Sequence, residues 1–192
     1  SESLVVEGAV YLYRTTGDDG WLREVLPKLE KGIDYITSDP KRWDSGRGLV
    51  KRPFTVDTWD FTCLKDAGTN RRIEENTPMS IMHGDNSGVY QAMRQLAWFN
   101  RRLGREEKAE NWEARAEELK ENIFRHLWNG KFFIHQLHIG HSGIDGLEAQ
   151  RLSLSNTYDI NRGLTDIEQS RSIISEYIAR RETTGCVSEW FT

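Results

Sequence analysis

The chain has 192 residues, of which 37% are hydrophobic and 29% charged, with a formal net charge of −4. A negative charge without a basic block disfavours nucleic-acid binding, and no apolar run approaches the ~20 residues that a membrane-spanning helix needs. Its 7 Trp, 6 Tyr and 7 Phe argue against disorder, and its 2 Cys form no Cys-x-x-Cys pair, so we expect one globular domain over residues 1–192 in a reducing compartment such as the cytoplasm.

Two stretches at the start of the chain repeat apolar residues at helical spacing. The first covers residues 4–12 and ends at the glycine-containing turn 16–20, where glycine suits a helix C-terminus. The second has its stripe over residues 22–36, with Pro27 near its start, and ends at Ser38-Asp39-Pro40. Together they predict a pair of helices.

Residues 40–84 show no helical period and contain glycines, prolines, two tryptophans and many charged residues. A stretch of this length inside a compact domain is usually a functional loop region or contains short strands. We therefore expect part of a functional site here.

The strongest helical pattern follows. Stripes over residues 89–103 and 109–127, joined at Gly104-Arg105, predict an αα-hairpin whose second helix has a charged outer face. Three polar residues could cap the first helix: Asp85, Asn86 and Ser87.

The last third of the chain predicts a mixture of elements. Residues 130–137 predict a short strand after an Asn-Gly turn, and residues 139–163 a loop. Thr165 and Glu168 form a capping-box pattern that opens a last helix. The fold class is therefore mainly α, with helical hairpins, long loops and a short β segment.

Three tryptophans stand beside a carboxylate outside the expected helices: Trp43-Asp44, Trp59-Asp60 and Glu189-Trp190. An aromatic plate can stack on a sugar, and an apolar ring raises the pKa of a neighbouring carboxyl group, which a general acid requires. Asp60 stands between two aromatics and is the better acid candidate. Asp57 has a simpler interpretation as a turn or cap residue.

Metal and nucleotide sites are not indicated. Three histidines have a His-x-x-His-x-x-His spacing (His135, His138 and His141), but positions three apart on a strand face opposite sides. The sequence contains no glycine-rich phosphate loop, no Gly-x-Ser-x-Gly and no His-Glu-x-x-His. We expect no metal and no cofactor.

Two segments resemble the six-hairpin glycosidases, the (α/α)6-barrel glycoside hydrolases. One is residues 84–128, with the turn Leu-Gly-Arg-Glu-Glu-Lys-Ala, followed by Asn129-Gly130-Lys131-Phe132; the other is Thr58-Trp59-Asp60-Phe61. The latter is similar to the Trp-Asp-Phe of trehalases and to the acid loop of processing α-glucosidases and glycogen-debranching glucosidases. The resemblance implies two rings of six helices, so about five helices here correspond to a partial barrel.

The resemblance also implies site residues and a carbohydrate substrate, for which an α-linked glucose-type saccharide is our expectation. Asp60 matches the general acid, and Glu189 is the late carboxylate expected to act as base, with Asp85 or Asp159 as alternatives. An inverting pair of this kind stands ~6.5–9.5 Å apart. The remaining expected substrate contacts are Trp43, Arg52, Asp57, Trp59, Asp85, Asn86, Asn161, Arg162 and Trp190.

Two other functions remain open at this point. A sugar epimerase or polysaccharide lyase with the same toroid would use His83 as a proton carrier. A non-catalytic helical-hairpin interaction domain would use its tryptophans only for packing.

Overall fold

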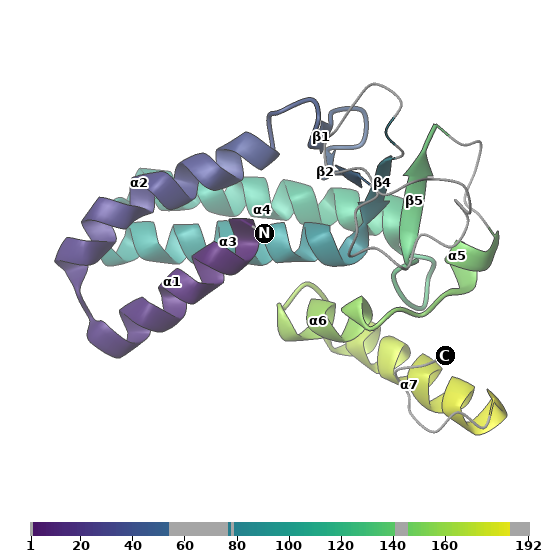
Figure 1. The fold of residues 1–192 in the computed structure, drawn as a ribbon. Coiled ribbons are helices and arrows are strands. Elements are labelled where there is room, and N and C mark those ends of the chain that lie inside the picture. Colours follow the sequence, from purple (N-terminus) through teal and green to yellow (C-terminus); the bar gives the residue numbers. More distant parts are fainter. Residues whose placement is uncertain (1, 54–76, 78, 141–145, 185–192) are drawn as a thin grey trace.

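The computed structural model describes residues 2–53, 77, 79–140 and 146–184 (Figure 1). The predicted mainly α fold is confirmed, because the described residues form seven helices and only short strands. The helices are α1 (Glu2–Thr16), α2 (Asp19–Ile36), α3 (His83–Arg102), α4 (Glu106–Leu127), α5 (Gly146–Gln150), α6 (Ser155–Asn161) and α7 (Ile167–Thr184).

The first four helices form two antiparallel hairpins that lie side by side (Figure 1). Asp18 caps α2 by accepting a hydrogen bond from the Trp21 amide at 2.9 Å, which satisfies one free N–H of the first turn. Pro27 lies inside α2 at an exposed position. Gly104, with φ +70°, makes the turn between α3 and α4, a conformation that favours glycine.

Helix α3 is the centre of the molecule and packs against α1, α2, α4 and α6. Leu96 and Phe99 of α3 are fully buried, as are Ala116 and Ile123 of α4. Burial of a side chain such as Leu or Phe contributes ~1.5–3 kcal/mol each. The packing therefore fixes the direction of α3 and the place where it begins.

Two small antiparallel sheets lie at the N-terminal end of α3. Strands β1 (Trp43–Asp44) and β2 (Leu49–Val50) form one sheet. Strands β3 (Arg52–Pro53), β4 (Met79–Met82) and β5 (Gln136–Ile139) form the other in the order β3-β4-β5. Strand β4 runs directly into α3, so the second sheet is tied to the first turn of that helix.

Four expectations about local structure were wrong. Helix α3 begins at His83, which places Asp85, Asn86 and Ser87 inside its first turns, and its N-cap Met82 makes no side-chain cap bond. The strand lies at 136–139, because residues 129–133 form a turn closed by a Trp128–Phe133 bridge.

The other two corrections concern residues 139–168. The expected loop contains α5 and α6. The capping box of α7 uses Asp166 and Gln169, one position later than predicted: Asp166 Oδ1 accepts from the Gln169 amide at 2.8 Å, and Gln169 Oε1 accepts from the Asp166 amide at 3.0 Å.

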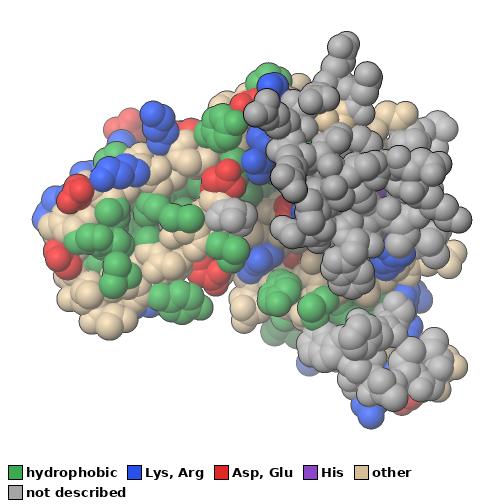
Figure 2. Space-filling model, in the orientation of Figure 1, with side chains coloured by type: hydrophobic (Ala, Val, Ile, Leu, Met, Phe, Trp, Pro, Cys, Tyr) green, Lys and Arg blue, Asp and Glu red, His purple; other side chains and the backbone are tan. Residues whose placement is uncertain are grey.

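Exposed apolar side chains are most numerous on two helices, α1 and α7. On α1 they are Leu4, Val5, Tyr11 and Leu12; on α7 they are Ile167, Ile174 and Ile178. Figure 2 shows hydrophobic side chains gathered over the end of the molecule formed by α1 and α2. Within the described ranges, no helix has the length and apolar character to cross a bilayer.

Candidate active site

Asn86 joins the first turn of α3 to the neighbouring strands. Its Oδ1 accepts from the Val50 amide at 2.7 Å, and its Nδ2 donates to the carbonyl oxygens of Val50 and Met82, both at 2.9 Å. The side chain is fully buried, so these bonds give it a structural role. Its predicted contact with a substrate hydroxyl stays a prediction.

Arg52 and Asp85 lie together at the same helix end. Arg52 Nη1 lies 3.7 Å from Asp85 Oδ2 and 3.6 Å from Met82 Sδ. Their side chains are 26% and 40% exposed, so both groups are accessible to a ligand. The position of Asp85 in the first turn is also favourable, because a helix N-terminus attracts negative charge.

A buried polar chain lies beneath this pair and connects α3 to α6. His83 Nδ1 lies 2.6 Å from Asp159 Oδ2, and His83 Nε2 lies 2.8 Å from Ser153 Oγ. The Phe133 ring stacks on the imidazole at 5.8 Å between centroids. Tyr177 donates to the Ser153 carbonyl at 2.6 Å, and burial, followed by the nearby Asp159 carboxylate, raises the pKa of its hydroxyl.

This arrangement bears on the alternatives for proton transfer. His83 is 1% exposed and Asp159 is 0% exposed, and both imidazole nitrogens are engaged. The geometry therefore favours a structural role for His83 over a proton carrier that meets substrate, and it disfavours Asp159 as a catalytic base.

Arg162 approaches the first turn of α3 from the other side. Its Nη1 donates to the Gly84 carbonyl and to Ser87 Oγ, both at 2.8 Å. A side chain at Gly88 would contact Ser3 Oγ at 3.1 Å and Arg162 Cζ at 3.6 Å. The glycine thus allows α1 and Arg162 to approach α3 closely.

The predicted site residues are only partly brought together. Arg52, Asp85, Asn86 and Arg162 surround the first turns of α3. Asn161 is exposed at the end of α6.

Trp43 pairs with Val50, the strand partner of Asn86, but its side chain is half-buried in a pocket of about 210 Å³ that Gly48, Met93 and Asn122 also line. Its neighbour Asp44 is engaged with Arg47, whose Nη1 lies 3.0 Å from Asp44 Oδ2.

Five predicted site residues lie outside the described residues: Asp57, Trp59, Asp60, Glu189 and Trp190. Pro53 and Met79, which flank residues 54–78 in the sequence, are cross-strand partners. Pro53 follows Arg52 directly, so this described strand pair lies beside the Arg52–Asp85 pair.

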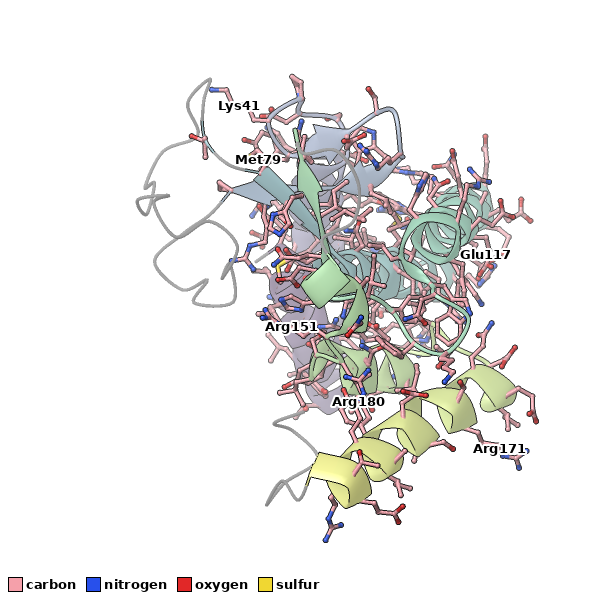
Figure 3. The ribbon with its side chains drawn as sticks, turned by 90° about the vertical axis from the view of Figure 1, so that its right-hand side faces the viewer. Lys41, Met79, Glu117, Arg151, Arg171 and Arg180 are labelled. Carbon is pink, nitrogen blue, oxygen red and sulfur yellow. The ribbon has the colours of Figure 1, made fainter. Side chains whose placement is uncertain are left out.

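Sequence reasoning missed a buried carboxylate at the same end. Glu148 of α5 is 0% exposed and pairs with Arg151 Nη1 at 3.2 Å, and its carbonyl oxygen accepts from the His135 amide at 3.4 Å. Figure 3 looks onto this end and labels Met79 and Arg151. A helix of five residues has too little periodicity to be found in the sequence.

Metal ligands do not gather in the described part of the chain, where no group of three His, Cys, Asp or Glu side chains has suitable geometry. His135 is buried and His138 is half-buried on β5. His141 lies outside the described residues.

Residues 2–153 match the family model of the mannosylglycerate hydrolase MGH1-like glycoside hydrolase domain. The chain belongs to this glycoside hydrolase family. The predicted resemblance to glycoside hydrolases is thereby confirmed at the level of the enzyme class, and a carbohydrate substrate follows from it. The match spans both helical hairpins and both sheets of this MGH1-like domain. No curated protein matches the chain.

Proposed function

We propose that this MGH1-like domain hydrolyses an α-linked hexoside with inversion at the anomeric carbon, within a six-hairpin architecture. Asp60 acts as general acid and protonates the leaving oxygen, and Glu189 acts as general base and activates water. The family match over residues 2–153 carries this proposal.

The position of the Arg52–Asp85 pair supports the placement of Asp60. Pro53 and Met79, the described residues that precede and follow Asp60 in the sequence, are cross-strand partners next to this pair. Arg52 can donate to hydroxyl or carboxylate oxygens, and Asp85 can accept from a sugar hydroxyl. Trp59 next to Asp60 supplies an aromatic plate for the sugar ring.

The substrate proposal has two arms. The Trp-Asp-Phe motif favours a glucose-type α-glycoside. The family description names mannosylglycerate, a mannoside whose aglycone carries a carboxylate. Arg52 of β3 lies beside the first turn of α3, where an anionic group is favoured. Initial rates on trehalose, maltose and mannosylglycerate distinguish the arms.

The reaction is tested by proton NMR of the first-formed sugar. Inversion of an α-glycoside yields the β-anomer of the sugar whose anomeric carbon is attacked, and release of that sugar first as the α-anomer refutes inversion. Trehalose is left out of this assay, because its leaving glucose is released as the α-anomer under either mechanism. Asp60→Asn is expected to lower the hydrolysis rate by at least ~100-fold while sugar binding stays close to that of the parent. The matched control is Asp44→Asn, another aspartate that follows a tryptophan, which should stay within a few-fold of the parent rate.

The base is tested separately. Glu189→Gln should reduce the rate as strongly as Asp60→Asn, whereas a parental rate removes Glu189 from the base role and makes Asp85 the next variant to measure. Absence of hydrolysis for every substrate in the panel contradicts the proposed function.

A further inference from the structure

A separate pocket lies between α1, α3 and the residue that follows α6, and arginines dominate it. Its volume is about 230 Å³, and Arg14, Arg94 and Arg162 line it together with Trp98 and Gln95. No acidic residue lines the pocket. Among the described residues, no carboxylate forms an ion pair with any of these three guanidinium groups.

Aromatic rings and neutral oxygens hold the three guanidinium groups in place. Arg14 lies over the Trp98 ring at 5.6 Å, and Arg162 lies over the Tyr158 ring at 5.4 Å. Arg94 donates to Tyr90 Oη at 3.2 Å. A guanidinium group has five N–H donors, so these contacts position the arginines and leave most of their donors available. Glu113 and Glu117 interact electrostatically with Arg94 from outside the pocket lining.

Gln95 adds a hydrogen-bond acceptor to the donors that the arginines supply. Its Oε1 is buried and accepts no hydrogen bond from the described residues. A buried acceptor without a donor costs free energy, and a ligand hydroxyl at this place would remove that cost. The pocket thus offers several donors for an oxyanion and one acceptor for a hydroxyl group.

We propose that this pocket binds a small hydroxylated oxyanion, a carboxylate or phosphate group attached to a few carbon atoms. The planar fork of arginine matches both anions. The volume is below the ~300–1,000 Å³ of pockets that enclose drug-sized ligands, so the pocket suits a small ligand better than a nucleotide. The anion site goes beyond the proposed glycosidase activity and does not depend on it.

The pocket adjoins the candidate active site and shares Arg162 with it, but its other arginines lie farther away. Arg94 follows Asp85 by nine positions on α3, about 14 Å along the helix axis at 1.5 Å per residue. Arg162 lies between the two, because it also bonds Gly84 in the first turn. Occupation of the anion site is therefore measured apart from hydrolysis, by direct binding.

The test is isothermal titration calorimetry of the full chain with sodium glycerate and with sodium phosphate at constant ionic strength. Glycerol is the neutral counterpart of glycerate, and sodium chloride is the reference salt. Saturable binding of glycerate or phosphate supports the proposal, and the stronger of the two identifies the anion. Binding of neither, or equal heats for glycerol and glycerate, overturns it.

Variants locate the site. Arg14→Gln and Arg94→Gln are expected to weaken the bound anion by at least about tenfold each, as loss of a charge-assisted hydrogen bond implies. Arg23→Gln on α2 is the matched control, because Arg23 is an exposed helical arginine outside the pocket. An equal loss for Arg23→Gln means non-specific attraction and overturns the proposal. Far-UV circular dichroism checks that each variant is folded.

Discussion

A carboxylate in α2 holds three helices together, and its removal is the sharpest test of how the fold is stabilised. Glu30 Oε1 accepts from Asn100 Nδ2 of α3 at 2.8 Å and from Trp112 Nε1 of α4 at 3.1 Å. Glu30 is 9% exposed, Asn100 0% and Trp112 4%. Lys108 Nζ lies 3.7 Å from the other carboxylate oxygen and is largely exposed.

The cost of Glu30→Ala follows from what each donor loses. Asn100 Nδ2 keeps its bond to the Leu96 carbonyl at 2.9 Å, so its loss is near the low end of the ~1.5–3 kcal/mol typical of a hydrogen bond to a charged group. Trp112 Nε1 loses its partner, which costs ~2–3 kcal/mol. Relief of the desolvated charge offsets part of the sum, which leaves a net destabilisation of about 3–4 kcal/mol.

Urea unfolding at pH 7, followed by tryptophan fluorescence and far-UV circular dichroism, measures this change. Glu30→Gln keeps an acceptor in place and should cost only about 1 kcal/mol. The control is Glu24→Ala on the exposed face of the same helix, where Lys28 lies 3.2 Å away and the expected change is below about 1 kcal/mol. If Glu30→Ala costs no more than Glu24→Ala, the proposed role of this carboxylate is refuted.

Three further predictions concern two turn glycines, His126 of α4, and the hydrogen bonds of Asn86 to the strands. Gly48 and Gly104 have φ of +64° and +70°, but a Cβ at Gly48 would collide with Asn122 Nδ2 whereas Gly104 faces open space. Gly104→Ala should lower the free energy of unfolding by about 1 kcal/mol, and Gly48→Ala should lower it clearly more. Equal losses of stability in urea unfolding would contradict the clash at Gly48. Burial, followed by nearby arginines, lowers the pKa of His126, so His126 binds a proton more readily in the unfolded chain than in the folded one. Its contribution to stability is therefore complete above pH ~6.5 and is lost as the pH falls below that value. His126→Gln should therefore flatten the decline in melting temperature between pH 7 and 5, and an unchanged slope would exclude this cause. Asn86→Ala removes three buried hydrogen bonds and should lower the free energy of unfolding by about 3 kcal/mol in the same assay. A decrease below about 1 kcal/mol would show that these bonds are dispensable for stability.

The hairpins could be predicted because their information is local. The stripes over residues 89–103 and 109–127 repeat at the helical period for many turns, and Gly104 marks the break between them. Short elements carry no such signal. Helix α6 has seven residues and α5 has five, so contacts with the rest of the chain decide their structure.

The candidate site was predictable only in part, for a similar reason. A polar residue near the start of a helix is predicted from sequence to be an N-cap. Asn86 instead accepts a hydrogen bond from the amide of Val50, in a strand 36 residues earlier. The partners of His83 are 70 and 76 residues away, a separation at which no motif spacing is informative. The capping box of α7 is predicted at Thr165 and Glu168, but Asp166 and Gln169 have the same spacing one residue later, and the backbone geometry selects the second pair.

The polar bonds around the start of α3 also have a consequence for the order in which the chain folds. Helices α3 and α4 are adjacent in sequence and need only a tight turn to meet, whereas this end requires contacts across 36, 56 and 76 residues. Closing long loops costs chain entropy before any contact compensates for it. We therefore expect the hairpins to assemble first and the N-terminal end of α3 last, and we expect partial unfolding to open that end while the helical pairs remain intact.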